Sequence, residues 1–294
     1  MTSAGSGLQT NIQSAVGAAS GEKGAFHAMK IWYQSAVSLD AAQPYQRLVE
    51  SRLEKIAPGV TVDIHGTPSA AHVSRDAKDH IGYVYVQSLN KEVFINGALR
   101  AEAEGYDAFF VGTLPDIGYE DIRTLVDIPV VAYGQASLMM GAMLGSCVGI
   151  VNFVHEIDPL LVRNARNYGL SSVLGPMVTL DSALDGVVGA YEHPGPLIEA
   201  FEIAARTAIA QGADVIIPGP GPLNALLAAN GVERVDGAPL IDSIAVGIKL
   251  CILRAELFQL NGTHVSRRGY YNERPRQELV AHLREMYQKT IDVV

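Results

Sequence analysis

Two stretches of the chain, GYDAFFVGTLP at residues 105–115 and GADVIIPGPGP at residues 212–222, follow the same plan. In each, an aspartate stands two positions after a glycine, and a run of apolar residues then leads into a turn rich in Gly and Pro. Each is followed by a helical stretch and by a strand that begins beside a proline. The repeat predicts two similar lobes whose equivalent strand ends face each other across a cleft, where a small ligand can bind. Thr113 and Pro220 occupy the equivalent turns.

Composition indicates an ordinary globular protein. Of the 294 residues, 48% are hydrophobic and 18% are charged, and the net charge is −9. An acidic chain is a poor match for nucleic acid, which favours a basic surface. No apolar run reaches the about 18 residues of a membrane span. We therefore expect neither a nucleic-acid partner nor a membrane partner. Two cysteines make no disulfide framework, so we expect the protein in a reducing cytoplasm.

Short β-rich runs alternate with longer helical patterns, which predicts an α/β fold with parallel sheets. The strands are expected at residues 30–33, 60–65, 108–111, 130–132, 148–153, 172–174, 215–217 and 239–241. The helices are expected at 44–57, 92–103, 159–167, 194–211 and 242–259.

The chain divides into four expected parts. Residues 1–28 are small, polar and glycine-rich, and we interpret them as a disordered leader or an addition to the native chain. Residues 29–133, completed by 240–260, form lobe 1, and residues 134–239 form lobe 2. Residues 261–294 form a C-terminal helical arm. We expect the arm to pack on a partner subunit in a homo-oligomer; the alternative is a lid that brings an arginine to the site.

Polar residues and glycines gather where the strands end, and ligands of parallel sheets bind at that edge. Backbone N–H groups, hydroxyls and amides there can hold a carboxylate without a cationic side chain. The alternative is that these residues only cap helices. The candidate substrate-binding residues are Gln34, Ser35, Thr67, Gly112, Gly134, Gln135, Ser137, Asn152, Gly219, Pro220, Asp242 and Ser243.

Three segments, residues 105–137, 212–223 and 238–250, together resemble the aspartate/glutamate/hydantoin racemase superfamily. The resemblance runs from about Met29 to Leu260. It implies two pseudosymmetric Rossmann-like lobes, an oligomer, and a small carboxylate or carbonyl substrate handled without a cofactor.

Racemases of this superfamily work with two cysteines, one from each lobe, and the resemblance places them at Thr113 and Pro220. Neither residue can act as a thiolate does. Cys147 and Cys251 fall inside an expected strand and an expected helix, so they do not replace the pair. We therefore expect neither two-thiol racemisation nor the single-cysteine decarboxylase and cis–trans isomerase reactions of the superfamily.

Hydrolysis or elimination beside a carbonyl fits this chain better than racemisation, because either reaction can proceed from one face of the substrate. The candidate catalytic residues are His155, Asp116, Tyr33 and Thr113, with His65 and Glu156 as further strand-end candidates. Two alternatives stay open. The protein is a non-catalytic binder of a small carboxylate, or a racemase or isomerase that uses bases other than cysteine.

We expect no metal and no nucleotide cofactor. His65, His72 and His80 form the one histidine cluster, which leaves a metal-assisted hydrolase as a further alternative, but their spacings of seven and eight match no compact metal motif. The chain has no G-x-G-x-x-G after a strand, no phosphate-binding G-x-x-x-x-G-K-[ST] and no G-x-S-x-G.

Overall fold

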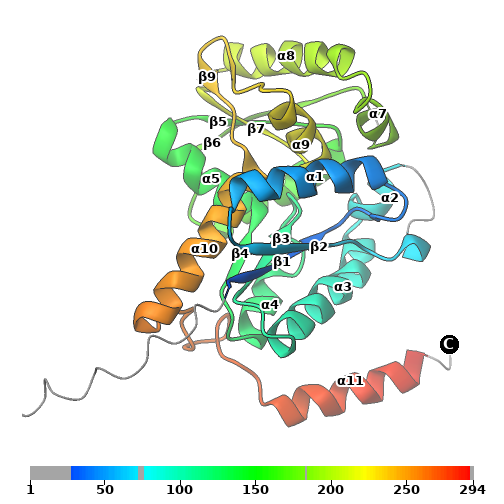
Figure 1. The fold of residues 1–294 in the computed structure, drawn as a ribbon, viewed down its shortest axis with the longest axis vertical. Helices are drawn as coiled ribbons and strands as arrows, with labels where there is room; N and C mark the ends of the chain where they lie inside the picture. Colours follow the sequence, from blue (N-terminus) through cyan, green and yellow to red (C-terminus); the bar gives the residue numbers. More distant parts are fainter. Residues whose placement is uncertain (1–27, 72–75, 183, 292–294) are drawn as a thin grey trace, which may run out of the picture.

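Two parallel β-sheets form the centre of the molecule in a computed structural model that describes residues 28–71, 76–182 and 184–291 (Figure 1). The first sheet has the strand order β2-β1-β3-β4 and the second the order β6-β5-β7. The strands are β1 (Lys30–Ser35), β2 (Thr61–His65), β3 (Ala108–Gly112), β4 (Val130–Ala132), β5 (Val148–Asn152), β6 (Leu174–Thr179) and β7 (Val215–Pro218). A short antiparallel pair, β8 (Arg234–Val235) and β9 (Ala238–Pro239), lies beside the second sheet. The α/β fold with parallel sheets is confirmed.

The central strands are buried because helices cover both faces of each sheet. Every residue of β3, β5 and β7 is buried, whereas the edge strands β2 and β6 are only partly covered. Continuous apolar runs such as AFFVG are typical of strands covered on both faces. The two repeated segments therefore become fully buried strands, β3 inside the first sheet and β7 at one edge of the second.

The helices connect and cover the strands, as Figure 1 shows for α3 below the first sheet and α8 above the second. Helix α10 packs against α5 and β3. The helices longer than four residues are α1 (Gln43–Ile56), α3 (Val84–Ala103), α4 (Tyr119–Leu125), α5 (Tyr133–Leu144), α6 (Asp158–Asn167), α7 (Leu184–Gly189), α8 (Gly195–Ala210), α9 (Gly221–Ala229), α10 (Ser243–Asn261) and α11 (Gln277–Ile291). Shorter helices are η1 (Ser69–Ala71), α2 (Lys78–Ile81) and η2 (His155–Ile157).

Three expected elements differ from the structure. Helix α3 begins at Val84 rather than residue 92, because its first turns carry exposed apolar residues that break the helical pattern. Strand β6 lies at Leu174–Thr179, beyond the expected 172–174. The strand expected at 239–241 is reduced to the end of β9 and a single bridge between Leu240 and Ile216.

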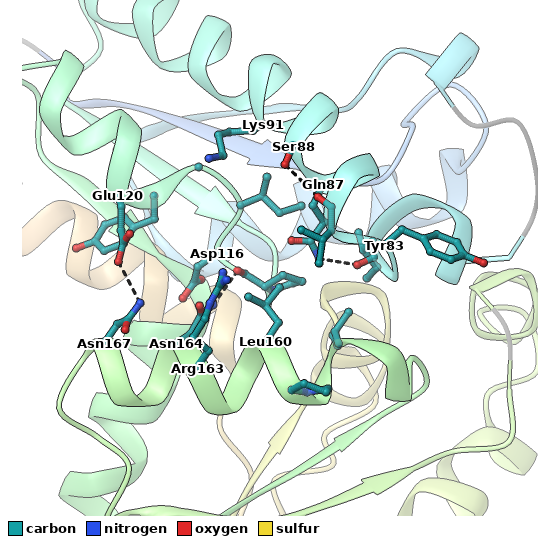
Figure 2. Close-up of a pocket in the computed structure, with 18 of the residues that line it drawn as sticks. Tyr83, Gln87, Ser88, Lys91, Asp116, Glu120, Leu160, Arg163, Asn164 and Asn167 are labelled. Atoms are coloured by element: carbon teal, nitrogen blue, oxygen red, sulfur yellow. Dashed lines mark hydrogen bonds between the residues drawn. The ribbon is translucent and has the colours of Figure 1, made fainter. Parts of the chain in front are cut away.

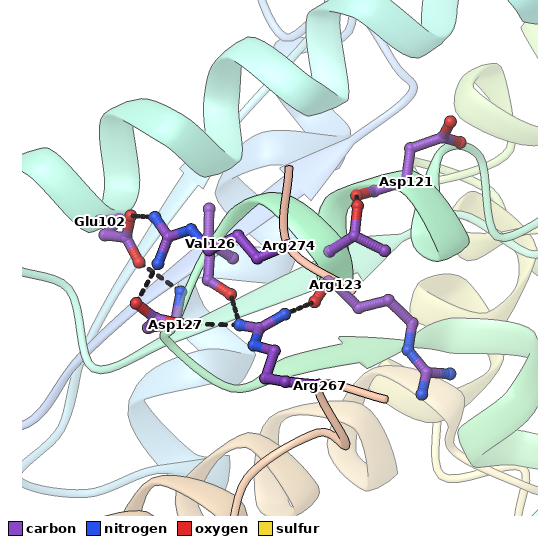
Figure 3. Close-up of polar contacts among 8 residues, drawn as sticks. Glu102, Asp121, Arg123, Val126, Asp127, Arg267 and Arg274 are labelled. Atoms are coloured by element: carbon purple, nitrogen blue, oxygen red, sulfur yellow. Dashed lines mark hydrogen bonds and ion pairs between the residues drawn. The ribbon is translucent and has the colours of Figure 1, made fainter. Parts of the chain in front are cut away.

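The segment after α10 is bound to the amino end of β4. Arg267 donates to the Val126 carbonyl and pairs with Asp127, and Arg274 pairs with Asp127 and Glu102 (Figure 3). These arginines lie at the opposite end of the sheet from Thr113, so they do not reach the strand-end cleft as the lid alternative requires. Packing of the arm on a partner subunit stays a prediction.

Within the described residues, no helix is long and apolar enough to cross a membrane. The expected leader, apart from residue 28, lies outside the described residues.

Candidate functional site

The carboxyl ends of β1, β3 and β7 border one small cavity, here called the inner cavity. Its volume is about 40 Å³, enough for a few waters or a very small chemical group. The residues of its wall that carry polar groups or belong to the two equivalent turns are Ser35, Tyr45, His80, Gly112, Thr113, Pro220, Gly221 and Pro222.

Both turns of the repeat line this cavity, but they offer it different chemistry. Thr113 directly follows β3 and is buried, and it contributes a hydroxyl. The second turn contributes Pro220 and Pro222, which have no N–H to donate. The Gly219 N–H is used by the Val151 carbonyl of the sheet at 2.9 Å. The second turn therefore has no ionisable group and few free backbone donors.

Tyr45 of α1 brings a buried phenol to the cavity. Its hydroxyl lies 3.1 Å from the hydroxyl of Tyr33, and the two hydroxyls share a hydrogen bond. Burial raises the pKa of both tyrosines. A neutral phenol is a hydrogen-bond donor rather than a base. Tyr33, a candidate from the sequence, thus does not line the cavity and is linked to it through its hydrogen bond with Tyr45.

His80 of α2 is the imidazole in the cavity wall, and its residue is 7% exposed. Its carbonyl accepts a hydrogen bond from the side-chain amide of Asn90 at 2.8 Å, which fixes α2 against α3. Lys78 of the same short helix pairs with Glu156 on the far side of the cleft at 3.1 Å. Histidine is the side chain that most readily exchanges a proton near neutral pH. Sequence reasoning considered His80 only as a metal ligand, because no periodic pattern surrounds it.

Of the other two histidines of the sequence cluster, the structure describes only His65, which does not line this cavity. The His65 ring stacks on Trp32, with ring centroids 3.5 Å apart, and burial lowers its pKa. His72 lies outside the described residues. Among the residues that the structure describes, no three His, Cys, Asp or Glu side chains are grouped as metal ligands would be.

Asp116 binds the start of α5 rather than the inner cavity. Its carboxylate accepts hydrogen bonds from the Gly134 N–H at 2.6 Å, the Gln135 N–H at 2.9 Å and the Tyr168 hydroxyl at 2.8 Å. Burial raises the pKa of Asp116 to about 7, although all three donors act to lower it. The Gly134 and Gln135 amides are consequently engaged and do not face the cavity as free donors.

His155 points to solvent at the start of η2. Its side chain is 70% exposed and lies 3.4 Å from the carboxylate of Glu156. Neither its position nor its exposure places it in the wall of the inner cavity. Its catalytic role stays a prediction from the sequence.

Most of the remaining candidates hold neighbouring backbone in place. The Gln34 amide donates to the carbonyls of His65 and Gly66, and the Asn152 amide oxygen accepts from the Val154 N–H. Of the predicted site residues, the structure brings Ser35, Gly112, Thr113 and Pro220 to the inner cavity. Those that do not line it are His155, Asp116, Tyr33, Gln34, Thr67, Gly134, Gln135, Ser137, Asn152, Gly219, Asp242 and Ser243.

A larger outer cleft of about 510 Å³ lies next to the inner cavity, between α3 and α6 (Figure 2). Figure 2 shows Lys91 projecting from α3 and Asn164 and Asn167 from α6, with Asp116 between the two helices. Ile81 lines both spaces and separates them. The outer cleft is lined by Pro115 and Asp116, at the end of the first turn, and by no residue of the second turn.

Neither cysteine lines the inner cavity. Cys251 is buried in α10, and this burial raises the pKa of its thiol. Cys147 directly precedes β5, at the end of the strand opposite to the cavity. The wall of the inner cavity thus contains no thiol.

The fold and this paired-turn cavity define a racemase-like α/β protein. The sequence profile of the family described as Asp/Glu/Hydantoin racemase matches residues 45–251. The chain belongs to this family.

Individual relatives are distant. The hydantoin racemase of Pseudomonas sp. (strain NS671) is 25% identical over 166 residues, which are 56% of this chain and 65% of that protein. The hydantoin racemase of Paenarthrobacter aurescens is 25% identical over 51% of this chain and 63% of that protein. The chain therefore matches less than two thirds of the length of these relatives.

Solved structures show the same fold. The allantoin racemase from Klebsiella pneumoniae is 18% identical, with a TM-score of 0.69 over 85% of this chain and 94% of that one. A glutamate racemase from Francisella tularensis in complex with D-glutamate is 14% identical, with a TM-score of 0.52 over 80% of this chain and 84% of that one. Arylmalonate decarboxylase shares the fold as well, at 17% identity and a TM-score of 0.52 over 77% of this chain and 92% of that one.

Proposed function

We propose that the protein is an enzyme that acts beside a carbonyl or carboxylate of a small polar metabolite, as a hydrolase or lyase rather than a racemase. The observation that carries this proposal is the unequal wall of the inner cavity. Titratable groups come from His80 and Tyr45, while the turn equivalent to that of Thr113 supplies Pro220, Gly221 and Pro222, none of which has an ionisable side chain. Proton inversion at one carbon needs an acid and a base on opposite faces.

In this proposal His80 is the acid–base group. It is held on the short helix α2 by the Asn90 contact and by the pair between Lys78 and Glu156. The Tyr45 phenol stabilises a substrate oxygen by donating a hydrogen bond, with Tyr33 as its partner. Thr113 offers a second hydroxyl close to the reacting group.

In this proposal the substrate occupies both the inner cavity and the outer cleft. The inner cavity, at about 40 Å³, accepts only the reacting carbonyl or carboxyl group, and the outer cleft of about 510 Å³ accepts the rest. A substrate that spans both must displace Ile81, which lines each of them. The relatives named as hydantoin, allantoin and glutamate racemases support cyclic ureides and small amino-acid carboxylates as the first compounds to test.

The test is incubation with such compounds, and with 2-substituted malonates, in D2O. A hydrolase or lyase produces new carbon resonances. A racemase exchanges the α-hydrogen for deuterium and inverts the centre while the carbon skeleton stays intact. Inversion without a new product would sink the proposal, and a ligand that binds and is recovered unchanged would favour the non-catalytic binder.

His80→Asn and His155→Asn form a matched pair of variants for the same assay. Removing a general acid–base group costs about 10²- to 10⁴-fold in rate, and we expect that loss for His80→Asn. We expect His155→Asn to stay within about twofold, because an exposed side chain outside the cavity contributes little. The reverse result would return the catalytic role to His155.

A further inference from the structure

A third cavity, intermediate in size between the inner cavity and the outer cleft, lies at the other end of the first sheet, near the amino end of β4. Its volume is about 100 Å³, and its wall includes Tyr119, Arg123, Val130, Arg254 and His264. Tyr119 also lines the outer cleft, so its ring separates the two spaces. One water molecule needs roughly 10–15 Å³ of such volume, so a cavity of about 100 Å³ can hold a polyatomic ion.

The wall of this cavity is cationic and has no acidic side chain. Arg123 and Arg254 both contribute to it, and neither forms an ion pair with any residue in the described part of the chain. The neighbouring Arg267 and Arg274 are different, because both lie against Asp127. Figure 3 shows the Arg123 side chain turned away from that carboxylate, while its carbonyl accepts from Arg267.

The Arg123 guanidinium is only partly satisfied by the protein. One terminal nitrogen donates to the side-chain oxygen of Asn272 at 2.8 Å, and the buried Nε has no hydrogen-bond partner. Its carbon lies 5.5 Å from the centre of the Tyr119 ring. Arg254 donates one hydrogen bond to the Val130 carbonyl. Partly buried guanidinium groups without a counter-charge are costly, and a bound anion removes that cost.

We propose that this cavity binds a small oxyanion of the size of phosphate or sulfate between the guanidinium groups of Arg123 and Arg254. The planar fork of arginine matches the oxygen spacing of such anions and forms short, charge-assisted hydrogen bonds with them. His264 follows α10, so the bound anion also joins the C-terminal segment to α4 and α10. This site lies outside the inner cavity and does not depend on the proposed reaction.

The test is isothermal titration calorimetry of the full chain with inorganic phosphate and with sulfate, against chloride at matched ionic strength. We expect saturable binding of one oxyanion per chain. A hydrogen bond to a charged group contributes about 1.5–3 kcal/mol, so Arg123→Gln and Arg254→Gln should each weaken binding by about tenfold or more. Arg206→Gln, which removes an equal charge on helix α8 over the second sheet, should leave the affinity unchanged.

Two results would overturn the proposal. One is an adventitious ion only: weak, unsaturated heat that follows ionic strength and is the same in every variant. The other comes from hydrogen exchange of the unmodified protein, which does not depend on whether the variants fold. We expect phosphate, but not chloride, to protect the amides at Arg123 and at His264–Val265, and equal exchange in both salts would exclude the site.

Discussion

The turns after β3 and β7 are the same in backbone plan and different in chemistry. Each follows a fully buried strand with a glycine, Gly112 or Gly219, and each lines the inner cavity through the next residue. After Thr113 the chain places a carboxylate, Asp116, on the start of α5, whereas Pro220 leads into a second proline. Packing of the buried strands requires the apolar residues of the repeat. The side chains in the turns that follow are not needed for that packing, so they can differ between the two turns.

The largest effect is expected from adding one methyl group to each turn. A Cβ on Gly112 would lie 1.8 Å from a ring carbon of Tyr33, and a Cβ on Gly219 would lie 2.5 Å from the Cδ2 of Leu114. Tyr33 is rigid and hydrogen-bonded to Tyr45, while a leucine end group can rotate. We expect Gly112→Ala to lower the free energy of unfolding by about 3 kcal/mol and Gly219→Ala by about 1 kcal/mol.

Urea denaturation followed by circular dichroism measures both values. Equal losses would show that the two turns are equally tight, and the contrast drawn between them would then rest on chemistry alone.

The next effect concerns the carboxylate that only the first turn has. Asp116→Asn leaves one oxygen where two accept three hydrogen bonds, so at least one donor loses its acceptor. We expect the free energy of unfolding to fall by about 1–3 kcal/mol. Asp121→Asn, on the exposed face of α4, should change it by less than about 0.5 kcal/mol. An Asp116→Asn protein as stable as the Asp121→Asn protein would contradict the capping role.

The ionisation of Asp116 gives a smaller, pH-dependent effect. Burial raises its pKa from 3.8 to about 7, so the folded protein binds this proton more tightly than the unfolded chain. The stability that comes from this proton is fully present below about pH 4 and is lost as the pH rises through about 7. A carbon NMR titration of the carboxyl group should show a midpoint near pH 7. A midpoint below 4 would mean that the three donors outweigh burial.

The smallest effect is expected at the ion pair between Lys78 and Glu156. Lys78→Ala and Glu156→Ala remove a partly exposed ion pair that joins α2 to η2. Such pairs contribute little to global stability, so the melting temperature should not move measurably. Hydrogen exchange of the α2 amides should nevertheless become faster in both variants and by the same factor. Unchanged exchange would show that the Asn90 contact alone holds His80 in place.

Much of the fold follows from local patterns in the sequence. The apolar runs at β3, β5 and β7 predict buried parallel strands, and the structure has them. The sequence predicts the bounds of helix α3 and strand β6 less accurately. Exposed apolar side chains in α3 and the partial burial of the edge strand β6 weaken the hydrophobic periodicity from which both are predicted. For the site, Ser35, Gly112, Thr113 and Pro220 were predicted and line the cavity, but Tyr45 was missed. That tyrosine is one of several apolar-face residues of α1, and no local signal separates it from the core.

The sequence by itself determined that the two equivalent turns carry Thr113 and Pro220 and no cysteine, because residue identity is covalent. That these are the positions of the cysteines in the family's racemases stays a prediction from the resemblance. Only the tertiary structure decided which polar groups are available for chemistry. It binds Asp116 to the Gly134 amide, and it brings His80, from a short helix with no recognisable pattern, to the cavity wall. The reason is that buried polar groups must be paired, and their partners come from segments far apart in the chain.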